Sequence, residues 1–101
     1  MIQHIVMLRL KPDADPAELA AVMQGLGALG LAGFTGFQHG PNRDYEAKTQ
    51  DYPYGFIGTF TDADAVATYA ADPRHQALGG RLVALCEGGG DGIMVMDIEP
   101  V

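Results

Sequence analysis

The sequence predicts one α+β domain over residues 1–101, with strands and helices in the order β-α-β-β-α-β. Three observations carry this prediction. Apolar and polar residues alternate at the start of the chain, as they do in a strand. Two later stretches repeat apolar residues at helical spacing. The length of 101 residues and the 48% of hydrophobic residues suffice for one core but not for two.

The first expected strand covers residues 2–11. His4 and Val6 belong to one face of this strand, and Ile5 and Met7 belong to the other. Both faces carry apolar residues, so we expect both to be covered. One layer of helices can cover a single face only, which leaves the other face for a second copy of the chain.

The first expected helix covers residues 15–30. Asp15 is a natural N-cap, Pro16 suits the first helical position, and Glu18 completes a capping-box pattern. Gly30 is suited to end the helix.

Three further strands are expected at residues 33–40, 54–60 and 93–99. The polar segment 41–53 is too long for a hairpin turn and should form a surface loop. A glycine-rich turn, residues 87–92, leads into the last strand.

The second helical region begins after a cap at Thr61 or Asp62, and Pro73 interrupts it. Asp72 is placed to cap a new helix with Pro73 at its first position. The full order is therefore that of a ferredoxin-like fold, a four-stranded antiparallel sheet with its helices on one face.

The interruption bears on Tyr69 and His75, which stand on either side of it. In one unbroken helix these side chains would point about 120° apart, whereas a break allows both to line one pocket. At the start of a helix the dipole keeps an imidazole neutral, but the Asp72 carboxylate acts in the opposite direction. The alternative is a Tyr69 side chain packed with its hydroxyl at the rim and a His75 without a functional role.

His4 is a third candidate, because it stands among aliphatic residues on the strand face expected to meet the helices. A buried imidazole needs a hydrogen-bond partner, and Tyr69, His75 or a backbone carbonyl could provide it. The spacing of His4 and His39 matches no metal-ligand motif, so we expect no metal and no cofactor. Cys86 continues a helical stripe and should be a small core residue.

The net charge of −7, from 13 acidic and 6 basic residues, argues against nucleic acid and anionic membranes as partners. The single cysteine fits a reducing compartment. The N-terminal residues do not form a signal-peptide pattern, and no apolar run is long enough to cross a membrane. The expected location is the cytoplasm.

Several segments, taken together, resemble the stress-responsive dimeric α/β-barrel (Dabb) domains. They are HIVMLRLKP, GFIGTF, YAADPRHQ and the closing strand that ends in D-I-E, and the resemblance extends from about residue 2 to 99. It implies a homodimer in which two sheets face each other in a barrel.

The resemblance also points to His4, Tyr69 and His75. In a plant polyketide cyclase of the family, a first-strand histidine and a Tyr…His pair on the second helix line the pocket, and the pair is catalytic. This chain departs from the family at Asp72, where a histidine is common, and at Tyr54, where the cyclase has a pocket histidine. Such changes imply a different ligand.

Three functions follow as hypotheses. The first is a stress-response or small-ligand-binding homodimer without turnover. The second is a cofactor-independent lyase or cyclase acting on a small apolar or aromatic carbonyl compound, with His75 as the base, Tyr69 as hydrogen-bond donor to the enolate and His4 orienting the pair. The third is a cofactor-free oxygenase.

Overall fold

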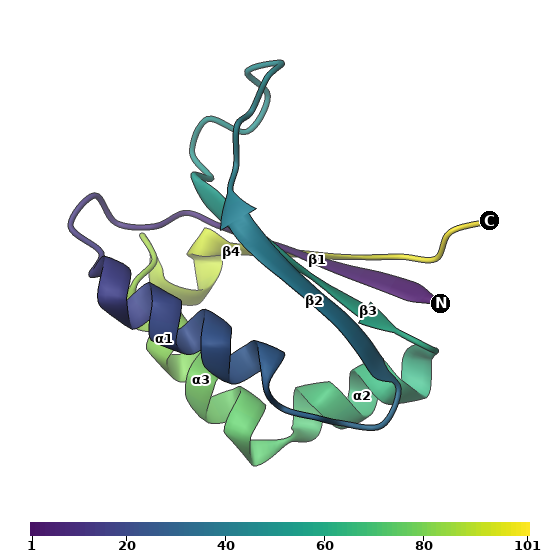
Figure 1. Ribbon diagram of the computed structural model, residues 1–101. Helices are drawn as coiled ribbons and strands as arrows, with labels where there is room; N and C mark the ends of the chain where they lie inside the picture. The colour runs from purple at the N-terminus through teal and green to yellow at the C-terminus, as the bar shows by residue number, and fades with distance from the viewer.

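The computed structural model describes residues 1–101, and its elements follow the predicted order with the second helical region divided in two (Figure 1). Four strands and three helices, with one short 3-10 turn, make up the fold. They are β1 (Ile2–Leu8), α1 (Pro16–Gly27), β2 (Phe34–Pro41), β3 (Tyr54–Phe60), α2 (Ala63–Ala71), α3 (Pro73–Ala84), η1 (Gly89–Gly92) and β4 (Ile93–Ile98).

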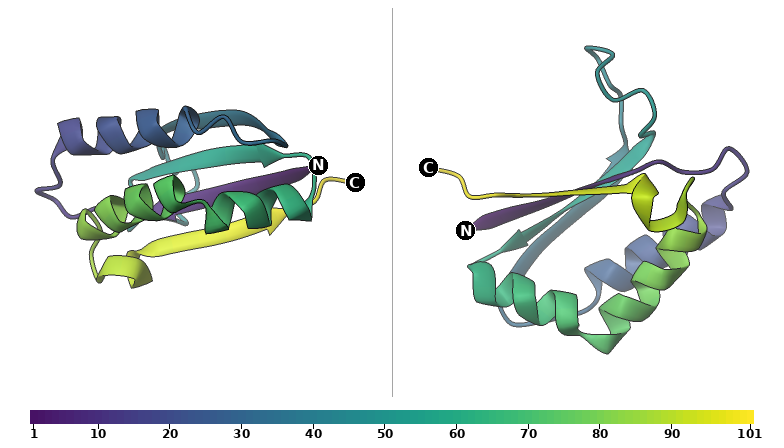
Figure 2. Two further views of the ribbon diagram at one scale, coloured as in Figure 1. Left: turned by 90° about the horizontal axis from the view of Figure 1, so that it is seen from below. Right: turned by 180° about the vertical axis from the view of Figure 1, so that it is seen from behind.

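The four strands form one antiparallel sheet in the order β2-β3-β1-β4. All three helices lie on one face of this sheet, and no element covers the other face (Figure 2). The fold is ferredoxin-like, as the sequence predicts. We call the uncovered side the open face.

The hydrophobic core lies between the sheet and the helices. Its most enclosed side chains, each no more than 1% exposed, come from both layers: Leu8, Val22, Met23, Leu26, Phe60 and Cys86. Cys86 is therefore the small core residue that its helical spacing predicts. Burial raises the pKa of its thiol, which keeps the sulfur protonated and unreactive.

Two predicted boundaries differ from the structure by three residues, whereas those of β2 and β4 differ by one. The strand expected over residues 2–11 ends at Leu8, because the backbone beyond it turns to bond elsewhere: Arg9 bonds to Gly92 and Glu87. The first helix ends at Gly27 rather than at residue 30. Gly30 lies past the helix with a φ of +63°, a conformation that glycine adopts without strain.

The segment 42–53 connects β2 to β3 and stands away from the sheet on the side opposite the helices (Figure 1). Hydrogen bonds hold its shape. The Asp44 carboxylate accepts from the backbone amides of Lys48 and Thr49 and from the Thr49 hydroxyl, and the Asn42 amide donates to the same hydroxyl. The predicted surface loop is therefore a braced projection, which we call the arm.

Candidate functional site

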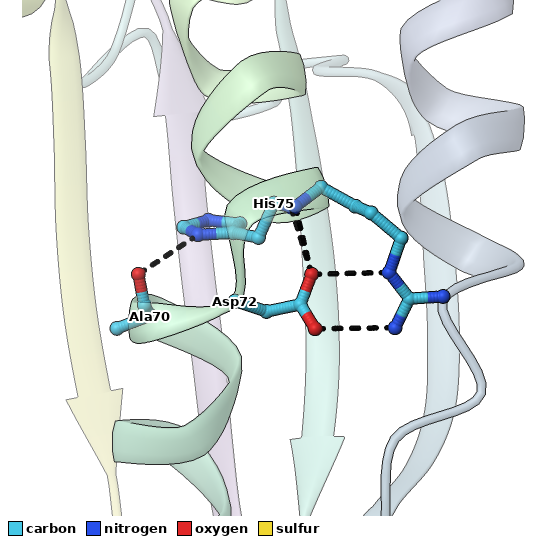
Figure 3. A network of polar contacts seen from close by, with 4 residues as sticks. Ala70, Asp72 and His75 are labelled. Atoms are coloured by element: carbon cyan, nitrogen blue, oxygen red, sulfur yellow. Dashed lines mark hydrogen bonds and ion pairs between the residues drawn. The ribbon is translucent and has the colours of Figure 1, made fainter.

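The break between α2 and α3 is built around Asp72. Its carboxylate Oδ1 accepts hydrogen bonds from the backbone amides of Arg74 at 2.8 Å and His75 at 3.4 Å, which caps α3 (Figure 3). The Arg74 guanidinium also binds this carboxylate through two nitrogens, each at 3.1 Å. Pro73 occupies the first helical position, where its missing N–H costs nothing.

This break places Tyr69, near the end of α2, against His75, in the first turn of α3. Their rings lie 4.0 Å apart between centroids at an interplanar angle of 40°. The His4 ring approaches Tyr69 edge-on from β1, at 5.7 Å. The three residues that the sequence singles out thus form one aromatic cluster.

The cluster forms part of the wall of a pocket of about 280 Å³ between the sheet and α2 and α3. Nine of the twelve lining residues are hydrophobic, and the three candidates supply all of its polar side-chain groups. The lining consists of His4, Val6, Phe56, Val66, Tyr69, Ala70, His75, Gly79, Leu82, Val83, Ile93 and Val95. Phe56 contributes to the wall, whereas Phe34 packs against Phe60 at 4.9 Å and leaves the pocket open.

Tyr69 is 2% exposed. Burial alone raises the pKa of its phenol to about 12, because a phenolate in an apolar environment loses its hydration. The hydroxyl is therefore protonated at neutral pH. It is a hydrogen-bond donor beside an apolar cavity, and no group in the chain takes part in its pKa shift.

His75 is half-buried. Burial, as the main cause, lowers the pKa of its imidazole, and the nearby His4 ring lowers it further. The Ala70 carbonyl, 3.4 Å from His75 Nδ1, and the Asp72 carboxylate act in the opposite direction without reversing the shift. Burial, which was not one of the two opposing effects expected from the sequence, thus decides the direction and favours a neutral ring.

The hydrogen-bond partner of His4 is Asp97, not Tyr69 or His75. His4 Nδ1 donates to Asp97 Oδ1 at 2.6 Å, and the two residues lie directly opposite each other on β1 and β4. In the neutral ring this bond leaves the lone pair on Nε2. Asp97 was not among the residues we predicted, although an acidic residue at a helix-facing position of the apolar strand IMVMDI is a signal that could have revealed it.

Two other candidate groups lie apart from this pocket. His39 Nδ1 is 2.6 Å from the Tyr54 hydroxyl, so the tyrosine that stands where the related cyclase has a pocket histidine pairs with His39 instead. Neither His39 nor Tyr54 lines the pocket that contains His4 and His75. No group of three or more histidine, cysteine, aspartate or glutamate side chains lies close enough together to hold a metal ion.

The pocket combines a neutral phenol donor, a neutral imidazole and a histidine held by a carboxylate in a mostly apolar wall. Such a set can bind a small molecule through one or two polar atoms and exclude water from the rest of it. No lysine or arginine lines the pocket, so the site favours an uncharged ligand. No helix of the chain is both long and apolar enough to span a membrane.

Comparisons with known proteins agree with this architecture. Residues 2–100 match the family model described as Dabb, stress responsive A/B barrel domain. A dimeric ferredoxin-like protein of unknown function from Jannaschia sp. CCS1 is 46% identical, with 98% of each chain covered and a TM-score of 0.92. A Dabb family protein from Mesorhizobium loti is 27% identical, with 99% of this chain and 96% of that chain covered and a TM-score of 0.77.

A more distant structure, a hydroxynitrile lyase from Passiflora edulis, is 15% identical over 96% of this chain and 90% of that chain, with a TM-score of 0.78. At that identity the likeness concerns the fold alone. No curated protein matches the sequence.

Proposed function

The chain belongs to the Dabb family of stress responsive A/B barrel domains, and from this premise we propose that it is a homodimeric protein that binds a small uncharged apolar molecule carrying a carbonyl or hydroxyl group. The observation that carries the proposal is the position of Tyr69, His75 and His4 in the wall of one apolar pocket. The Tyr69 hydroxyl would donate to the ligand oxygen, and the neutral His75 would accept from a hydroxyl.

Two observations support a homodimer. The open face carries exposed apolar side chains, with Ile57, Met94, Met96 and Ile98 between 36% and 49% exposed. A monomer rarely leaves so continuous an apolar surface in water. The 46% identical relative from Jannaschia is described as dimeric.

We also place the protein in the cytoplasm, which the single cysteine supports.

Two neighbouring glycines of α3 provide a matched test of ligand binding. A Cβ at Gly79, which lines the pocket, or at Gly80, which does not, would meet no atom within 4 Å. Both Gly79→Leu and Gly80→Leu should therefore fold, with a gain of helix propensity. Only Gly79→Leu should abolish binding of probes such as acetophenone and 4-ethylphenol, measured by calorimetry and by NMR shifts of His75. Equal binding by both variants would contradict the proposed site.

A second candidate function is the cofactor-independent lyase or cyclase. The observation that favours it is a neutral imidazole in ring contact with a protonated phenol, since a base and a hydrogen-bond donor are the two groups that enolisation needs. His75 would remove a proton from the carbon next to a carbonyl, and Tyr69 would stabilise the enolate oxygen. The Asp97 carboxylate would hold His4 in position beside them. No feature of the pocket favours the oxygenase in particular.

Exchange of the methyl hydrogens of acetophenone for deuterium, followed by NMR in D₂O, tests this second function. His75→Ala should abolish exchange while the dimer persists, and Tyr69→Phe should slow it by roughly 10²-fold. Exchange at the wild-type rate in His75→Ala would rule out the base. If the wild type binds acetophenone but exchanges none of its methyl hydrogens, the ligand-binding function stands and the lyase or cyclase function is excluded.

A further inference from the structure

We infer that the pocket between the sheet and helices α2 and α3, which we call the helix-side pocket, hydrolyses small uncharged aryl esters. His4 is the base that takes a proton from water, Tyr69 binds the ester oxygen, and Asp97 positions His4. The activity goes beyond the proposed function, although it rests on the same ligand pocket. It follows from how the two histidines of that pocket differ.

The first difference is in the groups that hold the Nδ1 atoms. His4 Nδ1 lies 2.6 Å from the Asp97 carboxylate, whereas His75 Nδ1 lies 3.4 Å from the Ala70 carbonyl. A short hydrogen bond to a charged acceptor is stronger than a long one to a neutral acceptor. When an imidazole takes up a proton at Nε2, a carboxylate at Nδ1 also stabilises the imidazolium. His4 is therefore the histidine that is better suited to accept a proton during a reaction.

The second difference is in what surrounds each ring. Burial is the main cause that lowers the pKa of His75, because a charged ring would lose its hydration there. The Asp72 carboxylate, which raises that pKa, is bound to the backbone amide and the guanidinium of Arg74. His75 is thus a neutral group of the pocket wall, and no carboxylate bonded to its ring stabilises its protonated form.

The reacting atoms of His4 and Tyr69 are free. Neither His4 Nε2 nor the Tyr69 hydroxyl makes a hydrogen bond within the chain, and the only fully buried side-chain polar atom without a partner is Arg9 Nε. The two free atoms therefore have accessible surface. Because both residues line the helix-side pocket, these atoms are available to a molecule that occupies it.

Water reaches His4 from the β4 edge of the sheet. Along the helix-facing side of this strand, Val95 is 50% exposed and the Asp97 side chain is 47% exposed. The His4 side chain is 13% exposed, whereas Tyr69 lies deeper, at 2%. An ester whose carbonyl oxygen meets Tyr69 thus has an enclosed hydrogen-bond donor on one side and a base close to solvent on the other.

The reaction needs only water as its co-reactant. His4 Nε2 removes a proton from water while the water oxygen bonds to the carbonyl carbon. The resulting oxyanion accepts a hydrogen bond from the Tyr69 hydroxyl, which stays protonated because its pKa is about 12. The bond between the carbonyl carbon and the aryl oxygen then breaks, and His4 returns its proton to the aryl oxygen. A phenol and a carboxylic acid leave, and the acid gives up its proton to bulk water.

The pocket favours this class of substrate by charge, size and leaving group. No lysine or arginine lines it, so a neutral ester enters and the carboxylate product is not retained. The net charge of −7 also repels that product. A volume of about 280 Å³ suits a small molecule. A single neutral donor stabilises the oxyanion only in part, which favours esters of phenols over those of alcohols because a phenol leaves more readily.

Hydrolysis of 4-nitrophenyl acetate, followed by absorbance, tests whether the pocket has this activity. Gly79→Leu fills the pocket and should lose the activity, whereas the matched Gly80→Leu should retain it. His39→Gln should also retain it, which excludes hydrolysis by this exposed imidazole outside the pocket. A rate in Gly79→Leu equal to that of the wild type would overturn the inference.

A second set of variants tests which groups act. His4→Gln should lower kcat roughly 10²-fold. Asp97→Asn should lower kcat roughly tenfold with KM and acetophenone binding unchanged, and Asp97→Glu should restore part of the rate, a pattern that a merely structural role would not produce. His75→Ala should lower kcat less than His4→Gln. Loss of hydrolysis in His75→Ala, with the wild-type rate in Asp97→Asn, would assign the proton transfer to His75 and contradict the inference.

The outcomes separate the hydrolytic activity from the proposed function. A wild type that binds acetophenone but hydrolyses the ester no faster than His4→Gln would exclude the activity and leave ligand binding intact. A wild type that neither binds the probes nor hydrolyses the ester would exclude both. Enolisation is read separately, because deuterium exchange should depend on His75 and hydrolysis on His4.

Discussion

The two faces of the sheet differ in how completely a single chain buries their side chains. On the helix face, Phe60 is fully buried, Tyr69 is 2% exposed, and His4 finds its partner in Asp97. On the open face, Ile57 and Met96 are 36% and 41% exposed. The helix face is thus largely covered within a single chain and holds its titratable groups in a fixed arrangement, although Val95 at the pocket is 50% exposed. The apolar side chains of the open face are left uncovered by the chain itself. One chain is therefore enough to form the pocket, whereas covering both faces of the sheet requires a second.

The largest expected effect is on the free energy of unfolding when each face is truncated. Phe60→Ala should cost about 3–5 kcal/mol, because it leaves a cavity in the core, and Phe60→Leu should cost less. Ile57→Ala, on the other face of β3, should cost under ~1 kcal/mol at dilutions that favour the monomer. Urea unfolding over a range of protein concentrations measures both. A loss from Ile57→Ala as large as that from Phe60→Ala in dilute samples would show that the open face is not open.

The buried phenol should make the helix face sensitive to alkali. The folded pKa of Tyr69, about 12, lies above the ordinary value of 10.0, so its contribution to stability is complete below pH 10 and is lost as the pH rises toward 12. The shift corresponds to roughly 2–3 kcal/mol. Unfolding midpoints between pH 9 and 11 should fall less steeply in Tyr69→Phe than in the wild type. Parallel curves would show that the hydroxyl is solvated.

The two helix caps allow the effect of Asp72 on the pKa of His75 to be separated from its effect on helix stability. Asp62→Ala and Asp72→Ala each remove a side-chain N-cap, from α2 and α3, and each should cost about 1 kcal/mol. Only Asp72→Ala also removes a carboxylate that raises the pKa of His75, so only this variant should lower that pKa further. Chemical denaturation and NMR titration of the imidazole measure the two effects. An equal change of the His75 pKa in both variants would contradict a local electrostatic cause.

Tyr69→Phe and Tyr52→Phe compare a pocket hydroxyl with one near the open face. Tyr69→Phe should leave stability at neutral pH nearly unchanged, because the hydroxyl faces the pocket, and Arg9 Nε is the only fully buried side-chain polar atom without a hydrogen-bond partner. Tyr52→Phe should lower it by a few tenths of a kcal/mol, since its hydroxyl accepts from the Arg9 guanidinium at 3.3 Å. Ligand affinity should fall only in Tyr69→Phe. A clear loss of stability in this variant would reveal a hydrogen bond at the hydroxyl.

The smallest effect expected is a mild loss of stability in weak acid. His75 has a folded pKa below its ordinary 6.5, so the unfolded chain binds more protons just below that pH and stability falls as the pH falls. The carboxylates with lowered pKa values, such as Asp44 and Asp72, act in a separate window below about 4. His75→Gln should flatten the curve between pH 6.5 and 5 and leave the lower limb unchanged. A wild-type curve that is already flat in that interval would contradict the burial of the ring.

The fold could be predicted from local signals because each element carries its own. Period-two alternation marks β1, Asp15 and Pro16 mark the start of α1, and Asp72 with Pro73 marks the break between α2 and α3. The end of β1 could not be predicted, since it depends on bonds that Arg9 makes with residues near the other end of the chain.

The candidate site was predictable in composition but not in its electrostatics. Tyr69, His75 and His4 could be named because the helix break and the strand face bring them toward one another. Asp97 could be noticed as an acidic residue on an apolar strand, but its pairing with His4 required the register between β1 and β4. The direction of the His75 pKa shift also had to come from the structure, since burial is its largest cause and the sequence does not give the degree of burial.

The pairing of His4 with Asp97 joins residues that are 93 positions apart in the chain. During synthesis, the ribosome makes β1 first and β4 last, so the pocket lacks one wall and His4 lacks its carboxylate until translation of the domain is almost complete. Every shorter nascent chain leaves unpaired the edge of β1 to which β4 bonds. A chain cut off before β4 therefore lacks Val95 and Asp97, and with them one wall of the helix-side pocket and the partner of His4.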